Sequence, residues 1–175
     1  MRKRRLLAYL VAAALAASAQ QPASIPDPKS AAVALGEVGS LLPDFTLKDL
    51  RGHPISSNDL KGKVVIIDFW STWCAPCKQE MPGYQELIDR YGPQGLAVVG
   101  LKSDAMADTE DPSKFAKRIG VRYPLAAVTD DLAQRFGGIA GLPTTLIYDR
   151  SGVLRKKIIG FEYTEAVEAE LKALL

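Results

Sequence analysis

Four stretches of the chain are rich in apolar, often β-branched, residues and have the length of β-strands. Val64–Trp70 and Leu96–Leu101 are almost continuously apolar, which is typical of central strands covered on both faces. Thr144–Tyr148 and Val153–Ile159 flank the turn sequence Asp149-Arg150-Ser151-Gly152, which predicts an antiparallel hairpin. These stretches predict the centre of a β-sheet.

Between the first and second of these stretches, and again further along the chain, the pattern changes to helical spacing, in which apolar residues recur every three or four positions. The clearest such helix precedes Gly92-Pro93, and its apolar positions are Met81, Tyr84, Leu87, Ile88 and Tyr91. Pro82 lies inside it and predicts a kink. Three shorter helices are predicted at 111–120, with Asp111 as N-cap before Pro112, at 129–136 and at 164–175.

Two short extended segments, Phe45–Leu47 and Ile55, surround the turn Arg51-Gly52-His53-Pro54 and predict an N-terminal hairpin. The element order is then hairpin, strand–helix–strand, inserted helix, second helix, hairpin and final helix. This order predicts an α/β fold with a mixed central sheet and helices on both faces.

The N-terminus has the features of a secretory signal peptide. Basic residues at positions 2–5 precede the apolar stretch Leu6–Ala16 and the small residues Ala17-Ser18-Ala19. The apolar stretch is shorter than the roughly 20 residues that a membrane-spanning helix needs. We therefore expect residues 1–19 to be a signal peptide, with an uncleaved anchor as the alternative, and the remainder to work outside the cytoplasm.

The next segment, residues 20–38, contains three prolines and no clear periodicity, which predicts a flexible spacer before a folded domain at 39–175. The chain has 22 basic and 20 acidic residues, and four of the basic ones belong to the signal. Cleavage would leave 18 basic against 20 acidic residues, a formal charge of −2. We therefore expect no nucleic-acid partner, and membrane contact only through an uncleaved N-terminal segment.

Cys74 and Cys77 are the only cysteines, and they lie where the strand 64–70 gives way to the predicted helix. Two cysteines three residues apart at a helix start share its first turn and can close a small disulfide ring. The free N–H groups and the helix dipole favour the Cys74 thiolate. We expect Cys74 to form a mixed disulfide and Cys77 to resolve it.

A structural disulfide and a metal site are the alternatives for this pair. A disulfide that closes so short a loop contributes little to stability. Tetrahedral zinc needs four ligands, whereas the chain has two cysteines and a single histidine, His53, in a turn where we expect it to be exposed. We therefore expect a redox-active pair with no metal and no cofactor.

Two carboxyl groups accompany the cysteines. Asp68 interrupts the apolar strand, where burial is costly unless the carboxyl group is paired or protonated. Glu80 follows Cys77 by three residues on the predicted helix. A partly desolvated carboxyl group near a thiol has a raised pKa and can exchange protons with it. An outward, solvated side chain is the alternative for each.

The sequence Asp-Phe-Trp-Ser-Thr-Trp-Cys-Ala-Pro-Cys at 68–77 resembles the active-site strand and turn of thioredoxin-fold oxidoreductases. Its continuation at 78–82 and the segment Pro43–Leu47 resemble the extracytoplasmic TlpA/ResA branch of that superfamily. Gly-Leu-Pro-Thr-Thr at 141–145 resembles the loop that carries the family's cis-proline. The resemblance covers 39–175 and implies a thioredoxin-like fold with an N-terminal hairpin extension and an inserted helix.

The resemblance also implies roles in substrate binding. Pro143 would be cis and lie against the disulfide, which would leave a backbone group of Leu142 free to pair with an extended substrate. Trp73 would shield the disulfide and shape the docking surface; simple packing is the alternative for Trp73.

For the proton of Cys77, the chain combines two family patterns. Asp68 matches the buried aspartate of thioredoxin, and Glu80 matches the glutamate of TlpA/ResA-like proteins. We favour Asp68 as the acceptor. Gly100 stands where thioredoxin has a lysine partner for this aspartate, and Lys102 is only a loose substitute.

The activity implied is that of an enzyme, a periplasmic or otherwise extracytoplasmic thiol–disulfide oxidoreductase with protein thiols and disulfides as substrates. We expect the reducing direction, as in cytochrome c maturation, with a membrane thiol transporter of the DsbD or CcdA kind as reductant. Ala75-Pro76 offers no histidine to stabilise a thiolate, which disfavours a DsbA-like oxidant.

Two other functions are alternatives to disulfide exchange. A peroxiredoxin would have proline seven residues before the reactive cysteine, where this chain has Ile67. A Sco-like copper chaperone would have three residues between its cysteines and a distant histidine, whereas this chain has two residues between them and no histidine after His53.

Overall fold

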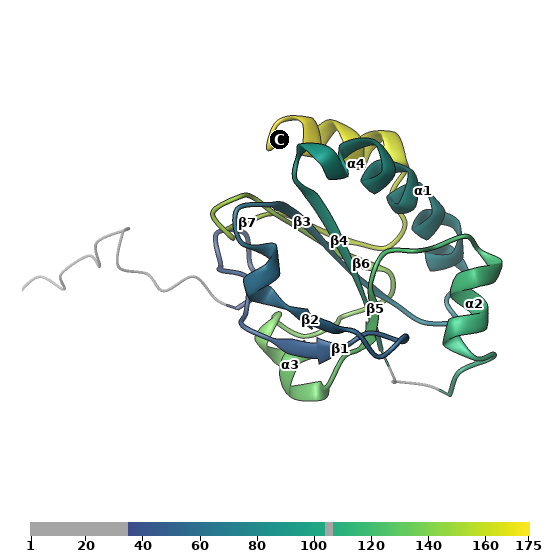
Figure 1. Ribbon diagram of the computed structural model, residues 1–175. Helices are drawn as coiled ribbons and strands as arrows, with labels where there is room; N and C mark the ends of the chain where they lie inside the picture. The colour runs from purple at the N-terminus through teal and green to yellow at the C-terminus, as the bar shows by residue number, and fades with distance from the viewer. Residues whose placement is uncertain (1–34, 104–106) are drawn as a thin grey trace, which may run out of the picture. The chain divides into compact units, whose positions relative to one another are not determined.

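A five-stranded mixed sheet organises the residues that the computed structural model describes, 35–103 and 107–175 (Figure 1). In spatial order its strands are β5 (Leu125–Ala127), β4 (Leu96–Lys102), β3 (Val64–Trp70), β6 (Thr144–Tyr148) and β7 (Leu154–Ile159). β3 pairs in parallel with β4, and β4 with β5, whereas β6 runs antiparallel to both β3 and β7. The predicted mixed sheet is confirmed.

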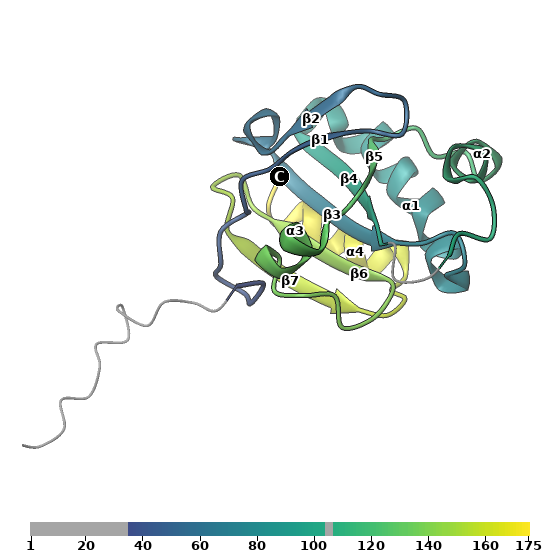
Figure 2. The same cartoon turned by 90° about the horizontal axis from the view of Figure 1, so that it is seen from below.

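Helices cover both faces of this sheet, as predicted (Figures 1 and 2). One face carries α1 (Ala75–Tyr91), α2 (Pro112–Arg118) and α4 (Thr164–Lys172). The other carries α3 (Asp130–Arg135) and the two-stranded hairpin of β1 (Thr46–Lys48) and β2 (Pro54–Ser56). Short 3-10 turns, η1 (Ser57–Leu60) and η2 (Gly92–Gln94), follow β2 and α1.

Alternate side chains of β3 enter two separate apolar cores, because successive strand residues point to opposite faces. Ile66 and Trp70 belong to the core beneath α1, whereas Val65, Ile67 and Phe69 belong to the core beneath α3. Asp68 lies between Ile66 and Trp70, points to the same face of the sheet, and is fully buried. β3 thus carries its one carboxyl group on the face covered by α1.

Most predicted elements recur with bounds shifted by a few residues, because ends are set by caps. The carboxyl oxygen of Asp111 accepts the N–H of Lys114 at 2.8 Å at the start of α2. α2 ends at Arg118 and α4 at Lys172, each short of its predicted end. α1 continues through Pro82, and at Gly83 an added Cβ would lie 2.0 Å from the hydroxyl oxygen of Thr164. Glycine at this position therefore leaves room for the side chain of Thr164 on α4.

Residues 39–42 form an addition to the sheet that the hydrophobic pattern did not predict. Leu41 bridges to Val153, and Gly39 and Ser40 exchange backbone hydrogen bonds with Leu154 at 2.8 Å. The predicted signal peptide and residues 20–34 of the predicted spacer lie outside the described residues. Within the described ranges, no helix is long and apolar enough to cross a membrane.

Candidate active site

The two cysteines form a disulfide at the amino end of α1, directly after β3. Cys74 is the N-cap of the helix, and its Sγ accepts the backbone N–H of Cys77 at 3.2 Å. The S–S distance is 1.99 Å. Cys74 keeps 3% of its surface exposed and Cys77 none. The predicted helix-start placement is confirmed, and Cys74 is the sulfur nearer to solvent.

The loop that leads into α2 is fastened to the segment that carries the cysteines. Thr72 donates from its hydroxyl to Asp108 at 2.8 Å and accepts the N–H of Thr109 at 3.0 Å. Lys102 forms an ion pair with the same Asp108 at 2.9 Å. Lys102, the loose substitute for thioredoxin's lysine, thus has the carboxylate of Asp108 as an ion-pair partner.

The loop before β6 contains the predicted cis-proline. The Leu142–Pro143 peptide bond is cis, and the carbonyl oxygen of Pro143 accepts the N–H of Gly160 at 2.8 Å. Within the described ranges, neither backbone polar group of Leu142 has a backbone partner. The side chains of Leu142 and Trp73 are both half-buried against the apolar core that contains the cysteines. Leu142 and Trp73 thus border the same core, and binding of substrate by Trp73, Leu142 and Pro143 stays a prediction.

Both candidate carboxyl groups are buried on the cysteine side of the sheet. Asp68 is fully buried and Glu80 is 1% exposed, so the outward, solvated alternatives are wrong. Within the described ranges, no carboxyl oxygen of either residue has a hydrogen-bond partner. Burial raises the pKa of Asp68, and burial together with the negative charge of Asp68 raises the pKa of Glu80, although the backbone of Glu162 acts on that pKa in the opposite direction. Gly100 is the register partner of Asp68 on β4, as predicted, so that position offers no cation.

Two hydroxyl groups that sequence reasoning did not connect lie in the same buried region. The phenol oxygen of Tyr84 lies 2.8 Å from Oγ1 of Thr145, and both side chains are fully buried. Thr145 is the register partner of Asp68 across the β3–β6 pair. The helical pattern had marked Tyr84 only as an apolar position, and the two hydroxyl groups are 61 residues apart in the sequence.

An exposed apolar ridge borders the cis-proline loop and was also missed. It consists of Ile159, Phe161 and Tyr163, which are 57%, 39% and 68% exposed. The rings of Phe161 and Tyr163 pack edge to face with centroids 5.1 Å apart. The ridge adjoins the loop because Gly160, between its first two members, donates to the carbonyl of Pro143. Exposed apolar residues gathered on one surface are typical of a docking surface.

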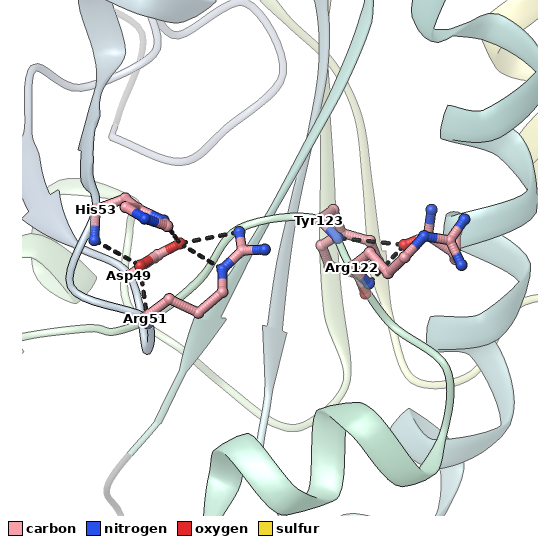
Figure 3. A network of polar contacts seen from close by, with 6 residues as sticks. Asp49, Arg51, His53, Arg122 and Tyr123 are labelled. Carbon is pink, nitrogen blue, oxygen red and sulfur yellow. Dashed lines mark hydrogen bonds and ion pairs between the residues drawn. The ribbon is translucent and has the colours of Figure 1, made fainter.

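The single histidine, His53, lies in the hairpin beside Asp49 and Arg51 (Figure 3). The carboxylate of Asp49 accepts the backbone N–H groups of Arg51 and His53, each at 2.8 Å. The imidazole is 71% exposed, as expected. Figure 3 also shows Arg122 and Tyr123, whose backbone N–H groups donate to the side-chain oxygen of Gln85 on α1. The bond from the N–H of Tyr123 holds the backbone of this residue, whose phenol is buried in the core beneath α1.

Comparison with known proteins gives consistent results. Residues 38–157 match the AhpC/TSA family. The chain is 36% identical over 138 residues to the thiol-disulfide oxidoreductase ResA of Geobacillus kaustophilus, covering 78% of each protein, and 34% identical over 139 residues to that of Bacillus anthracis, covering 79% of each. A crystal structure of a thioredoxin-family thiol:disulfide interchange protein from Chlorobium tepidum superimposes with a TM-score of 0.70 at 29% identity, over 78% of this chain and 96% of that one.

Proposed function

Because this chain belongs to the AhpC/TSA family and, within the thioredoxin superfamily, to the ResA-like thiol–disulfide oxidoreductases, we propose that it reduces disulfides of protein substrates outside the cytoplasm. It is an oxidoreductase with a thioredoxin-like fold. The observation that carries the proposal is a helix-capping cysteine pair above two buried carboxyl groups without hydrogen-bond partners in the described part of the chain.

The proposed reaction takes two exchange steps. The Cys74 thiolate attacks one sulfur of the substrate disulfide, so that a mixed disulfide forms and the first substrate thiolate leaves. Cys77 gives its proton to a buried carboxylate, and its thiolate attacks Sγ of Cys74, so that the Cys74–Cys77 disulfide forms and the second substrate thiolate leaves. The substrate gains two electrons and, after protonation, holds two thiols. Another dithiol then reduces the enzyme again.

The division of labour between the cysteines rests on burial and on the helix end. Cys74 is the more exposed sulfur, and as N-cap it lies at the positive end of the α1 dipole, which favours its thiolate. Cys77 is fully buried and needs a base at hand. Asp68 and Glu80 are the candidate bases, because raised pKa values suit groups that exchange protons near neutral pH.

The proposed substrate is an extended protein segment that contains the target cysteine. Its backbone would pair with Leu142, whose N–H and carbonyl groups have no backbone partner among the described residues. Trp73 and Pro143 would border the sulfur atoms, and Phe161 and Tyr163 would contact apolar side chains next to the substrate cysteine. These two exposed aromatic residues extend the docking surface beyond the three residues expected from the sequence.

Location and electron source remain part of the proposal. The predicted signal peptide supports work in the periplasm or an equivalent compartment. There a membrane thiol transporter of the DsbD or CcdA kind would supply electrons, and apocytochrome c disulfides are one class of target that the resemblance to ResA suggests. Signal peptide cleavage is tested by sequencing the N-terminus of the protein recovered from the producing cells.

Two variants test the proposed reaction. When the reduced Cys77→Ala variant is mixed with insulin, a covalent complex should accumulate, because the mixed disulfide cannot be resolved. Dithiothreitol should cleave this complex. With Cys74→Ala as the matched control, no such complex should form. Equal trapping by both variants, or rapid consumption of hydrogen peroxide in place of disulfide reduction, would contradict the proposal.

The docking surface has its own test. Phe161→Ser with Tyr163→Ser should raise the KM for insulin severalfold and leave the rate with a small aromatic disulfide unchanged. Leu41→Ser is the control, because Leu41 is similarly exposed at 67% but lies at the opposite end of β7. An unchanged KM in the double variant would remove the ridge from the docking surface.

A further inference from the structure

A small apolar pocket lies between the tip of the N-terminal hairpin, α2 and the segment that leads into β5. Its volume is about 200 Å³. Neither cysteine lines it, and neither does any other residue expected at the active site. An apolar cavity of about 150 Å³ is large enough to bind benzene, so this pocket has room for one aromatic ring. Five side chains form its apolar wall: Leu50, Ala116, Val121, Tyr123 and Leu125.

Hydrogen bonds hold the walls of this pocket together. The N–H of Leu50 donates to the carbonyl of Leu125 at 2.7 Å, which joins the hairpin to β5. The N–H of Val121 donates to the carbonyl of Ala116 at 3.0 Å, which joins the segment before β5 to α2. The same segment is fixed to α1, because its N–H groups at 122 and 123 donate to the side-chain oxygen of Gln85 (Figure 3). The walls are thus in place before any ligand binds, as is usual for small-molecule sites.

The rim of the pocket is positively charged. It carries Arg51, Lys117 and Arg122. The carboxylate of Asp49 also lines the pocket, but its side chain is 2% exposed and it binds the guanidinium group of Arg51 at 3.0 Å. Arg122 pairs at 2.6 Å with Asp89 of α1, which lies outside the lining. Within the described ranges, the ammonium group of Lys117 has no partner.

An apolar wall under a positive rim favours a small molecule with an apolar body and one negative charge. A protein partner would need further apolar contact area around the pocket that anchors it. The rim instead consists of charged groups. The large apolar side chains that are exposed in the described part of the chain belong to other segments: Leu35, Val38, Leu41, Ile159, Phe161 and Tyr163.

We propose that this pocket binds a small monocarboxylate whose apolar body is about the size of an aromatic ring. The apolar body lies against Val121 and Leu125, and the carboxylate pairs with the ammonium group of Lys117. The guanidinium nitrogen of Arg51 that does not contact Asp49 donates to the same carboxylate. Binding is non-covalent and transfers no electrons, so this inference does not rest on the proposed function.

The test titrates the isotope-labelled full chain with 3-phenylpropanoate and follows the backbone amides by two-dimensional NMR. The amides of Leu50, Val121 and Leu125 should shift saturably, with a Kd on the order of 1 mM for a ligand of this size. The neutral 3-phenylpropanamide should bind severalfold more weakly, and the cationic 3-phenylpropylamine should not bind. Raising the ionic strength from about 0.05 M to about 0.5 M should weaken binding of the acid severalfold.

Two pairs of variants test the rim and the wall separately. Lys117→Glu should weaken binding about tenfold, because repulsion replaces attraction. Lys114→Glu makes the same change of charge one turn earlier on α2, outside the lining, and should leave the Kd unchanged. Val121→Thr places a hydroxyl group in the apolar wall and should weaken binding severalfold. Val128→Thr is its control, because Val128 is similarly buried but belongs to the core beneath α3.

Three results would overturn the inference. The first is the absence of saturable shifts at the pocket up to about 20 mM acid, including shifts confined to the ridge at Phe161 and Tyr163. The second is equal affinity for the acid and the amide. The third is an equal loss of affinity in Lys117→Glu and Lys114→Glu. A protein that binds the acid as expected but does not reduce insulin would contradict the proposed function and support this site.

Discussion

The two faces of the central sheet differ in chemistry although the same strands build both. Towards α3, β3 presents Val65, Ile67 and Phe69 to an apolar core. Towards α1, the same strand presents Asp68 between Ile66 and Trp70. Among the described residues, the buried carboxyl oxygens without hydrogen-bond partners are those of Asp68 and Glu80, and both lie on the α1 side.

This difference indicates that one face stabilises the fold and the other carries the reaction. Polar groups buried without partners cost free energy, and the α1 face bears that cost where the cysteines need a proton acceptor. The α3 face, by contrast, packs aromatic rings such as Phe69 and Phe136 edge to face, with centroids 5.4 Å apart. Variants on the two faces should therefore separate stability from activity.

Phe69→Ala should have the largest effect on stability and little effect on the chemistry. Loss of a fully buried aromatic side chain from the α3 face should lower the free energy of unfolding by about 3–5 kcal/mol. Urea unfolding measures this change, and the rate of Cys74 attack, taken on the folded fraction in the absence of urea, should be unchanged. A cost below about 1 kcal/mol would show that the α3 face is not the main stabilising core.

Asp68→Val should act in the opposite direction and stabilise the protein by about 1–3 kcal/mol near neutral pH, while slowing resolution by Cys77. The pKa of Asp68 is raised in the folded protein, so the folded state holds its proton while the unfolded state releases it above about pH 4. Stability of the unmodified protein therefore falls as pH rises through this interval.

The Asp68→Val variant has no carboxyl group at this position, so its stability does not fall in this way. Its gain in the free energy of unfolding over the unmodified protein should therefore be smallest in acid and grow towards neutral and mildly alkaline pH. Urea unfolding at several pH values measures it. Ile66→Val, one position along on the same face, is the control and should show a small cost that does not vary with pH. An advantage of Asp68→Val that shrinks as pH rises would contradict a raised pKa.

Gly83→Ala tests how tightly the α1 face is held by α4. The new methyl group would lie 2.0 Å from the hydroxyl oxygen of Thr164, so the Thr164 side chain must turn away or the two helices must separate, at a cost of about 1–3 kcal/mol. Gly92→Ala is the matched control, because its methyl group would meet only Ile88 at an ordinary 3.6 Å. Equal thermal stabilities of the two variants would show that the contact at Gly83 is easily relieved.

The smallest effects should come from two buried tyrosines on opposite faces. Tyr84→Phe breaks the bond to Thr145 and should cost about 1 kcal/mol. Tyr148→Phe removes a hydroxyl group that has no partner among the described residues, and it should be neutral or slightly stabilising. Thermal unfolding followed by circular dichroism compares the two, and a larger cost for Tyr148→Phe would reverse the expected order.

Short-range patterns were sufficient to predict much of this fold. The apolar run 64–70, the capping residue Asp111 and the turn at 149–152 act through neighbours in the chain, and each predicted an element that is present. The motif at 68–77 predicted the cysteine pair and pointed to the burial of Asp68, and the motif at 141–145 predicted the cis peptide at Pro143.

What sequence alone did not predict depends on the register between distant segments. Thr145 lies opposite Asp68 only because β6 pairs with β3 in one particular register, and Tyr84 reaches Thr145 only because α1 crosses above that point. The bridge from Leu41 to Val153 likewise joins residues without a periodic signal. The helical spacing of Glu80 was visible, but its burial depends on what packs against that side of α1.

The midpoint potential of the Cys74–Cys77 pair tests the central claim most directly. It is measured by equilibrating the full chain with defined ratios of reduced and oxidised glutathione or dithiothreitol. A protein that reduces substrate disulfides should have a potential more negative than about −200 mV, on the side of thioredoxin at about −270 mV. A potential near −120 mV, that of a strong oxidant, would contradict the reducing role.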